Sequence, residues 1–170
     1  MAVSAYEMIS TTTVGTAVAT VTFSSIPATY TDLVLVCSAR TTRAATSDNL
    51  AVRFNSDSTA IYSATNLFGD TGAGSARSTG DSFCYWSYIP SASQASGTFG
   101  VATMNIMNYA NTTTFKTAVS KSGNTNAQLE TTANLYRSTS AISTLTMLSA
   151  TSNNIAVGST FTLYGIKAAA

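Results

Sequence analysis

Histidine is absent from this 170-residue chain, and charged residues make up only 9% of it. Average soluble domains carry about 25% charged residues, so uncharged polar groups must cover the surface instead. Without histidine, the commonest general base and metal ligand is missing, together with every Ser-His or Cys-His catalytic arrangement. The composition argues against most enzyme classes, and we expect no enzymatic activity and no catalytic residues.

Cysteine and long apolar runs are scarce as well. Only Cys37 and Cys84 occur, far apart and with nothing to complete a zinc site, and Cys37 is predicted to be a small buried hydrophobe at the end of an apolar strand. No stretch approaches the roughly 20 apolar residues of a membrane span, and the first eight residues lack the pattern of a signal peptide. We expect no metal, no cofactor and no membrane contact.

Charge of either sign is too sparse to form a patch. Eight basic and seven acidic residues give a net charge of +1, and no run of Lys or Arg could follow a phosphate backbone, so nucleic-acid binding is not expected. A net charge near zero protects a free monomer poorly against self-association. Ser and Thr, about a third of the chain, lose little entropy in protein contacts. These properties indicate an assembly subunit.

What the chain does contain is alternation with period two. Ala17, Ala19, Val21 and Phe23 fall on one face of a predicted strand, and the continuous apolar run within residues 31–38 predicts a central strand. Further strands are expected at residues 50–54, around 61–62, and at 83–89, 98–108, 113–121, 129–137, 141–149 and 159–166. Residues 69–80 are expected to form a long flexible loop.

About nine or ten short strands without helical periodicity predict an all-β protein. Because composition and charge do not shift along the chain, residues 1–170 are expected to form a single antiparallel β-sandwich domain, jelly-roll-like in its connections. The predicted core includes Leu33, Leu35, Val52, Phe54, Phe161 and Leu163. No internal repeat is visible, which argues against a β-helix or a propeller.

Several segments together resemble small β-rich virion proteins encoded by tailed phages, including phages of cyanobacteria and other marine bacteria. The segments are SIPATYTDLVL at residues 25–35, VRFN at 52–55, NLFGD at 66–70, STSAI at 138–142 and STFTLYGI at 159–166. Where such proteins often carry Ile-Pro-Asn-Tyr, this chain has Ile106-Met107-Asn108-Tyr109, so the strand is expected to run on there.

The resemblance implies a structural virion component that decorates or cements the capsid, or forms part of a tail fibre. Our first hypothesis is a non-enzymatic decoration protein that forms a homotrimer, binds the major capsid protein or other virion proteins, and resides in a virion assembled in the host cytoplasm. The alternative is a tail fibre or spike module that touches a host glycan with loops such as residues 68–82. The resemblance implies no catalytic site.

The sharpest enzyme-like motif is Asp70-Thr71-Gly72-Ala73, which copies the catalytic tetrapeptide of aspartic proteases. Only one copy occurs, so a symmetric dimer would be required. Gly69 precedes it where those enzymes have an apolar strand, and a mobile turn is the favoured interpretation. Asp48, Asp57, Asp70 and Asp81 are all expected in turns, where capping is favoured over a calcium site.

An aromatic cluster, Phe83, Tyr85, Trp86 and Tyr88, could present rings to a sugar. Alternation predicts that Phe83 shares a face with Tyr85, and Trp86 with Tyr88. One of the two faces must line the core, and a subunit interface would use the other equally well. The candidate interface or glycan-contact residues are Asp70, Tyr85, Trp86, Tyr88 and Tyr109.

Overall fold

The computed structural model of the chain describes residues 5–124 and 128–167. Twelve strands and no helix run through these residues, which confirms the all-β prediction. The strands are β1 (Tyr6–Thr13), β2 (Thr20–Phe23), β3 (Asp32–Ala39), β4 (Ser47–Phe54), β5 (Tyr62–Gly69), β6 (Ala73–Asp81), β7 (Cys84–Pro90), β8 (Gly100–Met107), β9 (Lys116–Asn124), β10 (Gln128–Tyr136), β11 (Leu145–Ser149) and β12 (Thr160–Ile166). No helix in the described ranges is long and apolar enough to cross a membrane.

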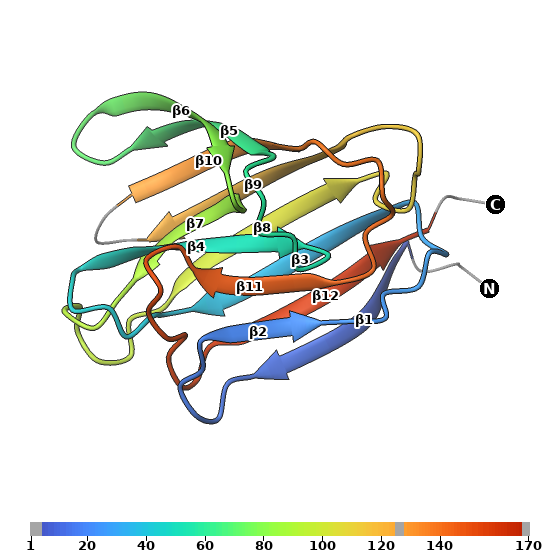
Figure 1. The fold of residues 1–170 in the computed structure, drawn as a ribbon. Helices are drawn as coiled ribbons and strands as arrows, with labels where there is room; N and C mark the ends of the chain where they lie inside the picture. Colours follow the sequence, from blue (N-terminus) through green and yellow to red (C-terminus); the bar gives the residue numbers. More distant parts are fainter. Residues whose placement is uncertain (1–4, 125–127, 168–170) are drawn as a thin grey trace.

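The strands form two antiparallel sheets that face each other (Figure 1). The larger sheet has the order β1-β12-β3-β8-β9-β10-β5-β6 and the smaller has the order β2-β11-β4-β7. Without β5, β6, β9 and β10, eight strands remain. Counted along the chain, the first, eighth, third and sixth of these lie in one sheet, and the second, seventh, fourth and fifth in the other. That order is a jelly roll, so the predicted β-sandwich is confirmed.

The four remaining strands extend the larger sheet beyond β8, in the order β9, β10, β5 and β6. The smaller sheet ends at β7, whose backbone lies against β9 and β10. In Figure 1 the strands β5 and β6 stand at the top of the molecule, above β7. The larger sheet therefore continues past the edge of the smaller one and leaves part of its inner face without a facing strand.

The predicted flexible loop at residues 69–80 is wrong, because β5 and β6 pair there as an antiparallel hairpin. Phe68 lies opposite Gly74, and Leu67 lies opposite Ser75. The residues of β6 are mostly Gly, Ala, Ser and Thr, which produce almost no hydrophobic alternation although their backbones pair normally. Strand β1 was not predicted, for a similar reason: it is rich in Ser and Thr and shows little hydrophobic alternation.

The boundaries of the other strands shift by a few residues from their predicted positions. Strand β2 begins only at Thr20, so Ala17 and Ala19 are exposed while Val21 and Phe23 are buried. Strand β9 begins at Lys116, because the side chain of Asn111 accepts hydrogen bonds from the backbone N–H groups of residues 113 and 114 and holds that segment in a turn.

The core lies between the sheets and contains every residue predicted for it. β3 is flanked by β12 and β8, as expected for a central strand. Six predicted core side chains have no exposed surface: Leu33, Leu35, Val52, Phe54, Phe161 and Leu163. Cys37 and Cys84 are free and buried, and burial raises the pKa of both thiols, so the predicted role of Cys37 as a buried hydrophobe is confirmed.

Truncation of a core aromatic residue should cost far more stability than truncation of an exposed one. Phe161→Ala removes a fully buried ring that lies 6.0 Å from the indole of Trp86, and is expected to lower the free energy of unfolding by about 3 to 5 kcal/mol. Phe115→Ala, at a position 52% exposed, is the matched control and should change it by about 0.5 kcal/mol. Urea denaturation of both variants measures the difference, and equal losses would contradict the assignment of the core.

Candidate functional site

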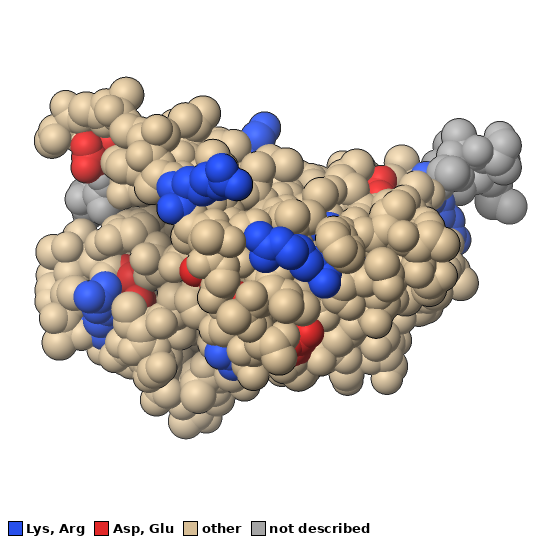
Figure 2. All heavy atoms as spheres, turned by 45° about the horizontal axis from the view of Figure 1, so that its top comes forward, with Lys and Arg blue, Asp and Glu red and all other residues tan. Residues whose placement is uncertain are grey.

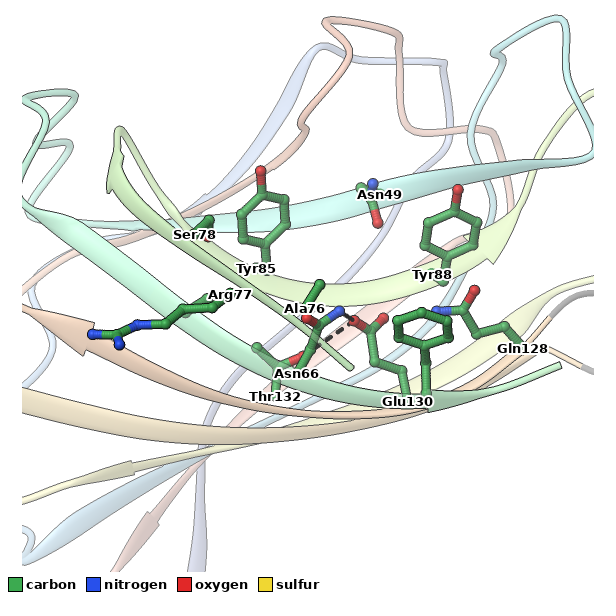
Figure 3. A pocket seen from close by; sticks show the side chains of 12 residues that line it. Asn49, Asn66, Ala76, Arg77, Ser78, Tyr85, Tyr88, Gln128, Glu130 and Thr132 are labelled. Carbon is green, nitrogen blue, oxygen red and sulfur yellow. Dashed lines mark hydrogen bonds between the residues drawn. The ribbon is translucent and has the colours of Figure 1, made fainter. Parts of the chain in front are cut away.

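A groove of about 330 Å³ lies where the larger sheet extends past β7 (Figure 3). One side is formed by Tyr85 and Tyr88 of β7 with Asn49 of the neighbouring β4. The other residues that line it come from β5, β6 and β10: Ala64, Asn66, Phe68, Ala76, Arg77, Ser78, Gln128, Glu130 and Thr132. Figure 3 shows the two tyrosine rings along β7, with the side chains of β5 and β10 beneath them in that view. The groove thus combines aromatic rings with amides, hydroxyls and one carboxyl.

A β-bulge in β7 places both tyrosines on this side of the strand. Leu50 pairs with Ser87, but the next residue, Ala51, pairs with Tyr85, so β7 contains one extra residue between them. That residue is Trp86, which is 1% exposed and packs in the core. The prediction that Trp86 shares a face with Tyr88 is wrong, because the bulge interrupts the alternation. Trp86 is therefore not a contact residue.

The free edge of β7 is tied to the larger sheet by side chains instead of by a strand. The amide of Asn134 in β10 donates to the carbonyl oxygen of Tyr85 at 2.9 Å, and the hydroxyl of Ser120 in β9 donates to the same oxygen at 3.4 Å. Tyr85 is also supported by Phe83, whose ring centroid lies 5.1 Å away in an edge-to-face arrangement. These contacts fix the bulge and with it the position of the tyrosines.

Glu130 lies at the bottom of the groove and is only 7% exposed. Its Oε1 accepts a hydrogen bond from the amide of Asn66 at 2.7 Å and another from the hydroxyl of Thr132 at 3.3 Å. Both donors meet the same oxygen, and within residues 5–124 and 128–167 no Lys or Arg forms an ion pair with Glu130. A buried carboxyl group thus faces the groove with acceptor capacity to spare.

Tyr109, a predicted contact residue, is completely buried. Its hydroxyl donates to the carbonyl oxygen of Pro27 and accepts from the backbone N–H of Tyr30. The strand does not run on as expected either, because β8 ends at Met107 and Asn108 turns the chain with a φ of +53°. Tyr109 therefore anchors the 27–30 segment, and its proposed contact role is wrong.

Asp70 lies at the exposed tip of the β5–β6 hairpin. Its carboxylate accepts from the backbone N–H of Gly72 at 3.0 Å and from the hydroxyl of Thr71 at 3.4 Å. These hydrogen bonds, the one from Gly72 first, hold its pKa below the usual value for Asp. The Asp-Thr-Gly sequence thus builds a hairpin turn, and the favoured interpretation as a turn is confirmed although that turn joins two strands.

The aspartates do not assemble into a cation site. Asp48 lies in β4, not in a turn, and its buried carboxylate accepts from the hydroxyls of Ser149 and Thr151, both at 2.7 Å. Asp57 accepts from the backbone N–H and the hydroxyl of Thr59 in a turn after β4. Within the part of the chain that the structure describes, no three acidic or Cys side chains gather as metal ligands.

The outer face of the larger sheet carries exposed aliphatic side chains and little charge. Val101 of β8 and Leu129 of β10 flank Gly123 of β9 in register, and they are 61% and 70% exposed. Because Gly123 has no side chain, the two aliphatic groups border a shallow depression, with Lys121 beside it. Leu67 of β5 continues the exposed aliphatic surface and is 64% exposed. We call Leu67, Val101 and Leu129 the outer aliphatic ridge.

Charges are scattered elsewhere on the surface. Figure 2 shows isolated Lys, Arg, Asp and Glu side chains separated by uncharged residues, with no continuous patch of either sign on the face in view. The ion pairs of the described residues are Arg43 with Asp48 and Lys167 with Glu7.

The sequence predicted Tyr85 and Tyr88, and the alternative hypothesis named residues 68–82, four of which line the groove. It missed Asn66 and the residues of β10. No local sequence motif marks Asn66, Gln128 or Glu130. Asn66 and Glu130 are far apart in the sequence, and the pairing of β10 with β5 brings them together. One signal was present in the sequence. The inward positions of β9 and β10 include polar residues where a core strand would carry apolar ones, namely Ser120, Ser122, Glu130, Thr132 and Asn134.

Comparison with known proteins identifies no family for the chain. No family model matches it, and no curated protein matches it. Among solved structures, a galectin of Caenorhabditis elegans, LEC-6, aligns over 93% of this chain and 96% of its own with 9% identity and a TM-score of 0.34.

The hairpin turn at Asp70 should depend on pH. Because the folded pKa is lowered, the stabilising effect of the ionised carboxylate is fully present above the ordinary Asp pKa of about 4 and is lost as the pH falls through the lowered value. NMR titration should show the Gly72 amide resonance shifting in that acidic range. Asp70→Asn keeps an oxygen acceptor but no charge, and should remove the titration while preserving the turn. A Gly72 amide shift that ignores pH in the unsubstituted protein would contradict this role.

Proposed function

We propose that this protein is a non-enzymatic structural component of a phage virion, a decoration or cement protein that binds the head shell as a homotrimer. The observation that carries the proposal is the outer aliphatic ridge. It lies on a broad sheet face with few charges: Val101 and Leu129 are aligned through Gly123 across β8, β9 and β10, and Leu67 lies on the next strand, β5, two residues from the partner of Leu129. The sequence resemblance to phage virion proteins supplies the biological setting.

The physical argument concerns desolvation. A surface of Ser, Thr and aliphatic side chains loses less hydration energy on contact than a surface of Lys and Glu, and interface cores are depleted in charged residues for that reason. Leu129, Val101 and Leu67 offer apolar area at the centre of such a contact. Many copies on a shell, each engaging more than one neighbouring subunit, add avidity beyond any single contact.

The abundance of the chain in purified particles tests the virion role. Quantitative mass spectrometry should give a ratio to the major capsid protein near one, or near one third. A ratio of a few per cent would overturn the head location in favour of a tail fibre or spike. Absence of the chain from particles would overturn the virion role altogether.

A pair of substitutions tests the surface. Leu129→Asp places a charge on the outer aliphatic ridge and should reduce occupancy of stripped shells at least about tenfold, because the carboxylate would have to be desolvated on contact. Val157→Asp is the control, since Val157 is also exposed, at 55%, but lies in the segment before β12. Thermal melting and sedimentation verify that both variants fold and form the same oligomer. Full occupancy by Leu129→Asp would rule out attachment through the ridge.

A further inference from the structure

The groove beside β7 is lined mainly by polar and aromatic side chains that lie outside the hydrophobic core. The geometry points to a binding site for a neutral, polyhydroxylated ligand, a short glycan segment, held between Tyr85 and Tyr88 on one side and Gln128, Glu130 and Asn66 on the other. This inference rests on the groove alone and does not depend on the proposed role in the virion.

The bottom of the groove is built as a binding surface and not as a core. Buried polar groups cost free energy unless they are hydrogen-bonded, so a sandwich interior normally replaces them with apolar side chains. Here Glu130 and Thr132 are 7% and 1% exposed and are bonded to each other. Asn66 donates to Glu130 and so holds the carboxyl group in one orientation. Such fixed groups lose little entropy when a ligand binds.

The hydrogen-bonding pattern fits hydroxyl groups. A sugar hydroxyl donates one hydrogen bond and accepts others, and the groove offers both kinds of partner. Glu130 accepts, while the amides of Gln128 and Asn49 at the margin can donate and accept. Since the two donors that the described residues offer to Glu130 both meet Oε1, the second oxygen is the one that would receive a ligand hydroxyl.

The charges of the groove favour a neutral ligand. Glu130 would repel an anion from the bottom, and the exposed guanidinium of Arg77 stands on the β6 side and would oppose a cation. No other Lys, Arg, Asp or Glu lines the groove among the described residues. A ligand with many hydroxyls and no net charge satisfies both constraints.

The aromatic rings supply the apolar part of the contact. Sugar rings present C–H faces that pack against aromatic rings, and the half-buried Tyr85 and Tyr88 lie on the same side of β7 because of the bulge at Trp86. On the opposite side the Phe68 ring packs over Gly74, where an added Cβ would come as close as 2.6 Å to the ring. The volume of about 330 Å³ lies at the lower end of the range of small-ligand sites, as a short glycan segment requires.

The test is direct binding of the full chain to three sets of oligosaccharides, which are neutral hexose oligomers, uronic-acid oligomers and amino-sugar oligomers with free amines. Isothermal titration calorimetry should detect a neutral oligomer, with an affinity that does not change from low to high salt. NMR should show the largest amide shifts at Tyr85, Tyr88 and Glu130. Binding of charged oligomers alone, shifts located elsewhere, or no binding of neutral oligomers at millimolar concentration would each overturn the inference.

Substitutions separate the groove from the rest of the surface. Glu130→Gln keeps the shape but removes the carboxylate, and Tyr88→Ala removes one ring; each should weaken neutral-glycan binding at least about tenfold. Tyr6→Ala, at a position 54% exposed on β1, is the matched control and should bind normally. If Glu130→Gln does not fold, Gln128→Ala at the margin serves instead. Unchanged binding by folded variants would place the ligand elsewhere.

Leu129→Asp, which tests the outer aliphatic ridge, should retain glycan binding. Failure of the virion proposal and failure of the glycan proposal therefore remain distinguishable.

Discussion

The structure depends on a mismatch in size between its two sheets. The apolar side chains on the inner face of one sheet are buried only where the other sheet covers them. A sheet of four strands covers only part of a sheet of eight. Over β12, β3 and β8 the cover is complete, and the inward side chains there are Leu, Ile, Phe, Met, Ala and Cys. Over β9 and β10 the facing strand is β7, the last of the smaller sheet. Beyond Lys116, Ala118 and Tyr136 the inward residues there are Ser, Thr, Asn and Glu. The boundary of the smaller sheet is therefore also the boundary between core and groove.

The sequence was sufficient for the parts of the fold where alternation and burial coincide. Val52 and Phe54, or Phe161 and Leu163, alternate with polar residues, and all four are buried as that pattern requires. It was insufficient where strands are made of small polar residues. Pairing in β6 comes from backbone hydrogen bonds, which every residue but proline can form, and so leaves no trace in side-chain hydrophobicity.

The candidate site was only half predictable for a related reason. Tyr85 and Tyr88 stand out because they belong to a cluster of four aromatic residues at positions 83–88, but alternation assigned Trp86 to the wrong face. One inserted residue reverses the predicted face, inward or outward, of every later side chain in the strand. No local sequence feature of β7 indicates the bulge. Glu130 could not be placed opposite β7 without knowing that β10 lies between β9 and β5, which is a property of the whole sheet.

The pairing of β1 with β12 has a consequence for how the molecule is made. Tyr6 lies opposite Ile166, so a strand near the start of the sequence pairs with one 160 positions later, and among the described residues β12 is the only strand that pairs with β1. During synthesis β1 remains unpaired until β12 has left the ribosome. An unpaired strand edge of this kind, here ending in three consecutive Thr residues, is a template for the same strand of another nascent chain. Correct folding therefore depends on relative rates. The β12 strand of each chain has to pair with its own β1 before the β1 of a neighbouring copy pairs with it.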